Sequence, residues 1–97
     1  MIERDERGWR LTGAMLNTNA TALLAAGRGF LRQQDAPRSI VVDLAAVEET
    51  DSSALAVIFA WLRTARSAGI DLRLAHMPDS MISQARLYGV YDTLPQA

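Results

Sequence analysis

Residues 48–65, EETDSSALAVIFAWLRTA, constrain the fold more than any other part of the chain. They begin with charged and hydroxyl-bearing side chains and continue from Ala54 to Leu62 with nine apolar residues in a row. An ordinary surface helix has one apolar side and one polar side. This segment instead predicts a helix over about residues 52–68, ended by Gly69, that is apolar nearly all round and polar at its beginning.

Short strands are predicted on both sides of this helix, where residues alternate in polarity or are β-branched. They lie at about residues 2–6, at Trp9–Gly13, at residues 39–44 and at Ile70–Ala75. The third of these, SIVVDL, is apolar on both faces, which predicts a central, covered strand. The AAVEET segment that follows it is predicted to be a loop.

Helical spacing of apolar residues predicts two further helices, one over about residues 18–34 and one that begins with MPDS, residues 77–80. Gly27 and Gly29 weaken the first of these by roughly 1 kcal/mol each relative to Ala. Strands joined by single helices favour parallel neighbours with right-handed crossovers. We therefore expect one domain, residues 1–97, of the α/β class, with a mixed sheet of about four strands and three helices mainly on one face.

The composition argues against several classes of function. Ten basic and eleven acidic residues give a net charge of −1 with no basic cluster, so no nucleic-acid partner is expected. The lack of Cys excludes disulfides and Cys metal sites. No apolar run approaches the roughly 18 residues that cross a bilayer, and the charged start MIERDERGW is unlike a signal peptide. We expect a cytoplasmic protein without direct membrane insertion.

The sequence contains no recognisable catalytic or metal-binding group of residues. His76 is the only histidine and is expected to be a solvated loop residue, because a metal site needs further ligands. There is no glycine-rich phosphate loop, and the serines of the DSS triplet have no histidine near them to act as a base. We therefore expect a binding protein and not an enzyme, with no catalytic residue, no metal and no cofactor.

Four polar residues, Thr50, Asp51, Ser52 and Ser53, stand where the long helix begins and its first N–H groups lack partners. Helix capping explains any two of them and remains the alternative for the group. A hydroxyl here also lies at the positive end of the helix dipole, where a phosphate is favoured. Ser52 is therefore a candidate for phosphorylation or for contact with a partner.

The two sides of the long helix differ in composition. At about 100° per residue, the side expected to face the core carries Leu55, Val57, Ile58, Trp61, Leu62, Ala65 and Ala68. The other side carries Ser52, Ser53, Ala56, Phe59, Ala60, Arg63 and Ser67. Small residues and one aromatic ring beside hydroxyls predict a partner-binding surface. The alternative is that a loop of the same chain covers it, although a chain of 97 residues has little loop to spare.

The segments WRLTG, SIVVDLAAVEETDSSALAVI and GIDLRLA resemble the STAS domain, which bacterial anti-sigma factor antagonists share with the cytoplasmic tails of sulfate transporters. The resemblance extends from Trp9 to Pro95. In antagonists the serine directly after the aspartate is phosphorylated by a partner kinase, and Ser52 holds that position here. Ala54 replaces the usual glycine of this motif and Ala14 replaces a frequent acidic residue, which puts phosphorylation in doubt but not the fold.

The tail QARLYGVYDTLP, residues 84–95, resembles the end of the B subunit of the Mla phospholipid-transport ABC system, a stand-alone STAS protein that sits on the transporter's ATPase. The chain ends at Ala97, whereas antagonists usually continue into a further segment. The resemblance implies a non-catalytic subunit that binds and stabilises or regulates this ATPase, peripheral to the inner membrane, and so maintains outer-membrane lipid asymmetry. The alternative is an antagonist that binds an anti-sigma factor kinase and is switched by phosphorylation of Ser52. A nucleotide or small-ligand sensor is a more distant third.

Overall fold

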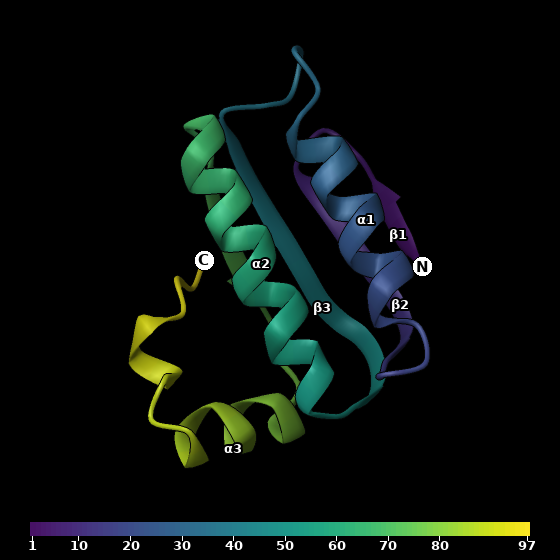
Figure 1. The fold of residues 1–97 in the computed structure, drawn as a ribbon, viewed down its shortest axis with the longest axis vertical. Coiled ribbons are helices and arrows are strands. Elements are labelled where there is room, and N and C mark those ends of the chain that lie inside the picture. The colour runs from purple at the N-terminus through teal and green to yellow at the C-terminus, as the bar shows by residue number, and fades with distance from the viewer.

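The structure is a computed structural model that describes residues 1–97, and its strands and helices alternate along the chain (Figure 1). The strands are β1 (Ile2–Arg4), β2 (Gly8–Met15), β3 (Ser39–Thr50) and β4 (Asp71–Ala75). The helices are α1 (Ala20–Leu31), α2 (Ser52–Ala68), α3 (Asp79–Leu87) and a short 3-10 turn at Tyr91–Thr93. The helix predicted over residues 18–34 is therefore shorter at both ends.

The four strands form one sheet in the order β1-β2-β3-β4. β1 pairs with β2 antiparallel, whereas β2, β3 and β4 are parallel. Helices α1 and α2 are the two crossovers, and they lie side by side over one face of the sheet (Figure 1). α3 lies across the beginning of α2, at the lower end of this view. The predicted mixed α/β sheet with three helices is confirmed.

The core lies between the sheet and the two crossover helices. Trp61 of α2 is completely buried at its centre, with its ring edge-on to Trp9 of β2 at 5.3 Å between centroids. Its indole N–H donates to the carbonyl of Leu24 in α1 at 3.3 Å. Helix α2 contacts α1, α3 and strand β4, which explains in part why it is apolar nearly all round.

The AAVEET segment is not a loop, as the sequence suggested, but the second half of β3. It is a strand because β2 runs beside it as far as the pair Met15 and Thr50, with two register shifts on the way. Val47 is buried and anchors this half to the core. Only Asp51 separates β3 from α2, so the polar end of α2 is fixed directly to a sheet strand.

β3 is central, as predicted, but it is covered on only one face. Ile40, Val42 and Leu44 point into the core, whereas Val41 and Asp43 between them are only partly buried. On the neighbouring β4, Arg73 is exposed at the position that pairs with Val41. No second layer of helices packs on the other face of the sheet. The apolar SIVVDL pattern therefore reflects the position of β3 between two neighbouring strands.

Candidate protein-binding site

Asp51 closes the beginning of α2 and ties it to a distant loop. One carboxylate oxygen accepts the N–H of Ser53 at 2.8 Å, and the other accepts the N–H of Asn17 at 2.9 Å. The Asn17 N–H, followed by the Ser53 N–H, stabilises the charged carboxylate and holds the pKa of Asp51 below its ordinary value. Asp51 therefore acts as a cap and as a clamp between β2 and α2.

The other three polar residues of this end have different surroundings. The Ser53 hydroxyl donates to the Asn17 side chain at 3.4 Å, and the Thr50 hydroxyl lies 2.6 Å from that of Ser80, at the start of α3. Ser52 is the first residue of α2, is exposed, and makes no side-chain hydrogen bond within the chain. Three of the four predicted residues thus hold elements together, and Ser52 alone presents a free hydroxyl.

The outward side of α2 is narrower than the sequence predicted. Ala56 and Arg63 are exposed, and Phe59 is partly buried with its ring against the core. Ala60 is only 4% exposed and cannot offer its side chain to a partner, which corrects its place in the predicted surface. The reason is helical spacing, since Ala60 is on one line of α2 with Ser53 and Thr64, on the side toward α1.

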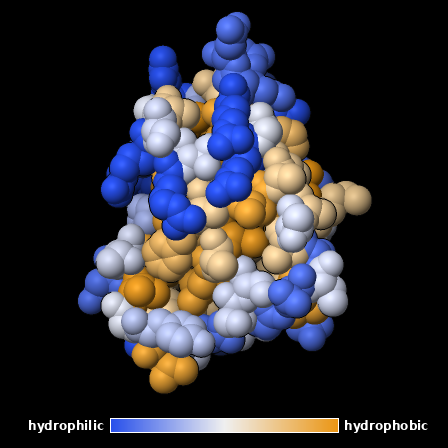
Figure 2. All heavy atoms as spheres, viewed as in Figure 1, coloured by the Kyte–Doolittle hydropathy of each residue, from blue (hydrophilic) through white to orange (hydrophobic).

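We call the remaining set Ser52, Ala56, Phe59 and Arg63 the α2 surface. Viewed from the helix side, hydrophobic side chains are visible over the middle and lower parts of the two crossover helices, and hydrophilic side chains gather over their upper ends (Figure 2). The α2 surface extends from Ser52, which begins the helix, to Arg63 in its second half. It combines a small exposed residue, the edge of an aromatic ring and a cation in one stripe.

Sequence reasoning missed Asn17 and Ser80, the two residues that position the polar end of α2. A contact over thirty or more positions along the chain leaves no local pattern, so only the fold brings these residues together.

The single histidine has no contact with this site. His76 is largely exposed, and its Nδ1 lies 3.1 Å from a carboxylate oxygen of Asp43. The pKa of Asp43 is lowered chiefly by the N–H of Ala45, and the interaction with His76 adds to this. No group of three or more His, Asp or Glu side chains is arranged to hold a metal ion. None of the helices is both long and apolar enough to cross a membrane.

A mixed four-stranded sheet with two crossover helices on one face is the fold that this chain shares with a solved STAS domain. The same fold occurs in the anti-sigma factor antagonist SpoIIAA in its unphosphorylated form, with a TM-score of 0.72 at 17% identity over 99% of this chain and 84% of that chain. Phosphorylated SpoIIAA, a Bacillus cell fate determinant, gives 0.72 at 17% identity over 100% and 89%. The SulP transporter STAS domain from Vibrio cholerae gives 0.63 at 12% identity over 95% and 71%.

Within this class, the family model described as "Mlab, STAS domain" matches residues 2–95, and the chain belongs to that family. No curated protein has a matching sequence. The predicted membership of the STAS class and the likeness to anti-sigma factor antagonists are therefore confirmed at the level of fold and family.

Proposed function

We propose that this chain is a non-catalytic subunit of an Mla-type phospholipid-trafficking ABC transporter, and that it binds the cytoplasmic ATPase through the α2 surface. The observation that carries the proposal is the exposed stripe of α2 in a chain of the Mlab family. In this proposal the protein works in the cytoplasm, attached to the inner membrane through its partner. The transporter it serves maintains outer-membrane lipid asymmetry.

The surroundings of the α2 surface suit it to docking. The Asp51 clamp and the Thr50–Ser80 contact fix the start of α2 against two other elements. Little conformational freedom is therefore lost when a partner binds there. The methyl group of Ala56 lets a partner helix or loop come close to the α2 backbone. Phe59 offers part of its ring, and Arg63 offers a cation at the far end of the contact.

A subunit that binds one conformation of an ATPase shifts the enzyme toward that conformation. It also stabilises the folded ATPase by mass action, because it binds the folded chain and not the unfolded one. Both effects need only a rigid surface with differential affinity, and neither needs chemistry from this chain.

The proposal is tested by co-expressing the chain with the ATPase encoded in the same transporter operon. We expect the two proteins to co-purify, the isolated chain to hydrolyse no ATP, and the ATPase to change its turnover or melting temperature when the chain is added. Failure of the wild-type chain to bind the ATPase would overturn the proposal.

The second candidate is an anti-sigma factor antagonist switched by phosphate on Ser52. It is favoured by one observation, the exposed Ser52 hydroxyl without a hydrogen-bond partner at the start of α2. Incubation with an anti-sigma factor kinase encoded nearby, followed by mass spectrometry, tests it with Ser52→Ala as control. Phosphate on Ser52 that appears only with this kinase would favour the antagonist over the transporter subunit.

A further inference from the structure

The two crossover helices carry positive charge only. The chain as a whole carries a net charge of −1, yet α1 and α2 contain no acidic residue. Their charged side chains are Arg28, Arg63 and Arg66, and Arg32 follows directly after α1. The layer formed by these two helices is therefore purely cationic, although acidic residues outnumber basic ones in the sequence.

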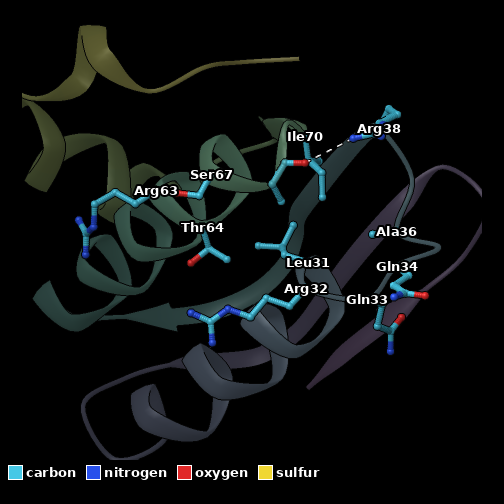
Figure 3. Close-up of a pocket in the computed structure, with 11 residues that line it drawn as sticks. Leu31, Arg32, Gln33, Gln34, Ala36, Arg38, Arg63, Thr64, Ser67 and Ile70 are labelled. Carbon is cyan, nitrogen blue, oxygen red and sulfur yellow. Dashed lines mark hydrogen bonds between the residues drawn. The ribbon is translucent and has the colours of Figure 1, made fainter.

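Three arginines, two of them from this helical layer, gather around a pocket between the C-terminal ends of α1 and α2 (Figure 3). It has a volume of about 490 Å³, and its lining includes Arg32, Arg38, Arg63 and the hydroxyls of Thr64 and Ser67. No aspartate or glutamate lines it. The lining thus combines three cations with hydroxyl and side-chain amide groups and contains no carboxylate.

The three guanidinium groups are nearly unused within the chain. None takes part in an ion pair, and only Arg38 donates a side-chain hydrogen bond, to the carbonyl of Ala68 at 3.4 Å. Each guanidinium offers five donors in a planar fork that fits carboxylates.

Arginines near helix C-termini also interact favourably with the helix dipole. In this structure the last turn of α1 already contains Arg28, and the last turn of α2 contains Arg66. Arg32 is the C-cap residue of α1 and Arg38 donates to the last carbonyl of α2, so the dipoles favour these two cations as well, whereas Arg63 lies before the last turn of α2. The three arginines come from different segments around the pocket.

We propose that this pocket, lined by Arg32, Arg38 and Arg63, receives an acidic segment of the protein that binds the α2 surface. The inference rests on the proposed function, in which that protein is the transporter ATPase. Arg63 belongs both to the pocket and to the α2 surface, so one partner covers the two without a break. Carboxylates of the segment supply the negative charge that α1 and α2 lack.

The arrangement of the arginines favours an extended segment over a single bound anion. In Figure 3 the guanidinium ends of Arg32, Arg38 and Arg63 point in different directions around the pocket and do not converge on one point. A lone phosphate would need donors aimed at one centre. Several carboxylates spaced along a peptide match separate cations better.

The test uses Arg32→Glu combined with Arg38→Glu, because both residues lie outside the α2 surface. The affinity of the purified full chain for the ATPase is measured at low and high salt. We expect the double variant to bind at least about tenfold more weakly at low salt and to lose most of the salt dependence. Arg73→Glu in β4 makes the same charge change in an exposed ion pair with Asp71, and should leave the affinity within about twofold.

Thermal melts verify that the variants are folded, and Arg32→Gln with Arg38→Gln replaces the Glu pair if that pair melts early. Wild-type chain that fails to bind the ATPase contradicts the proposed function itself. If the wild-type chain binds the ATPase and the folded double variant binds it equally well, only the inference of an acidic segment in the pocket is contradicted.

A photo-reactive side chain at position 38 identifies what enters the pocket. We expect it to capture a segment of the ATPase rich in Asp and Glu. Capture of a segment without acidic residues would overturn the inference. The inference would also be overturned if the isolated protein sediments with vesicles of anionic phospholipid and the Arg32→Glu, Arg38→Glu variant does not. That result would assign the pocket to lipid headgroups.

Discussion

Gly27 of α1 lies directly against the indole ring of Trp61 in α2, so closely that a Cβ at position 27 would collide with the indole nitrogen and its neighbouring carbons. The glycine lets the two crossover helices approach each other while Trp61 fills the space beneath them. Because α2 packs on this contact, the orientation of the α2 surface depends on a residue that is itself buried.

Gly27 and Gly29 in the same helix should respond in opposite ways to alanine. Gly27→Ala gains about 1 kcal/mol of helix propensity, but overpacking against Trp61 costs about 1–3 kcal/mol, so the net effect is a loss of stability. Gly29→Ala meets nothing within 4 Å and should stabilise the protein by about 0.5–1 kcal/mol. Denaturant unfolding of the two variants measures both signs, and stabilisation by Gly27→Ala would show that the helices are not in close contact.

Trp61→Ala should lower the free energy of unfolding by about 3–5 kcal/mol, because it leaves a large cavity beneath α2 and removes the packing on Trp9. Urea unfolding followed by circular dichroism gives the value. A loss of partner binding with unchanged unfolding would instead place Trp61 on the binding side of the helix.

Asp51→Asn should make stability less sensitive to acid. The folded-state pKa of Asp51 is lower than the ordinary carboxyl value of 3.8, so the unfolded chain binds a proton more readily than the folded one. The stabilisation is therefore complete at pH values above 3.8 and is lost as the pH falls from there through the folded-state pKa. Wild type should melt higher than Asp51→Asn near neutral pH, and this difference should shrink in acid. A constant difference at all pH values would contradict the clamp as a charged group.

Ser52→Asp should separate stability from binding. A carboxylate at the first position of α2 is favoured by the helix dipole, so the free energy of unfolding should stay within about 0.5 kcal/mol of wild type. Affinity for the ATPase should fall, because the charge enters a contact that otherwise meets a neutral hydroxyl. Ser83→Asp, at an exposed position of α3, is the control. Equal binding by the two variants would remove Ser52 from the contact.

The sequence predicted the elements whose local pattern agrees with their final environment. α2 was predicted at residues 52–68 because its apolar run, its polar beginning and Gly69 all indicate the same helix, and Gly69 does adopt the left-handed conformation at its end. The mixed sheet followed from strands joined by single helices. The polar end of α2 was also recognised, since unpaired helix N–H groups need partners wherever they occur.

Other features depended on contacts between distant parts of the chain. β2 pairs with AAVEET and turns a polar segment into a strand. From the sequence, Gly27 is only a residue that weakens its helix, whereas in the structure it makes room for the indole ring of Trp61. Ala60 was assigned to the outward side because a helical projection does not show that α1 covers a second side of α2. The arginine pocket joins three segments, and only the lack of acidic residues in both helices could have indicated it from sequence.

The central claim is that the outward side of α2 binds the transporter ATPase, and Ala56 is the residue that tests it most cleanly. Phe59 is less suitable because its ring also packs on the core, so a change there would weaken the fold. Ala56 is exposed, so Ala56→Arg should leave the melting temperature unchanged. Ala45→Arg places the same side chain at an exposed position of β3, outside α2.

The decisive measurement is the affinity of wild type, Ala56→Arg and Ala45→Arg for the purified ATPase, beside thermal melts of all three proteins. We expect the three to melt alike, Ala45→Arg to bind as wild type does, and Ala56→Arg to bind at least about a hundredfold more weakly, since a buried unpaired charge costs several kcal/mol. Wild-type affinity of a normally folded Ala56→Arg would show that the ATPase binds elsewhere and would contradict the account.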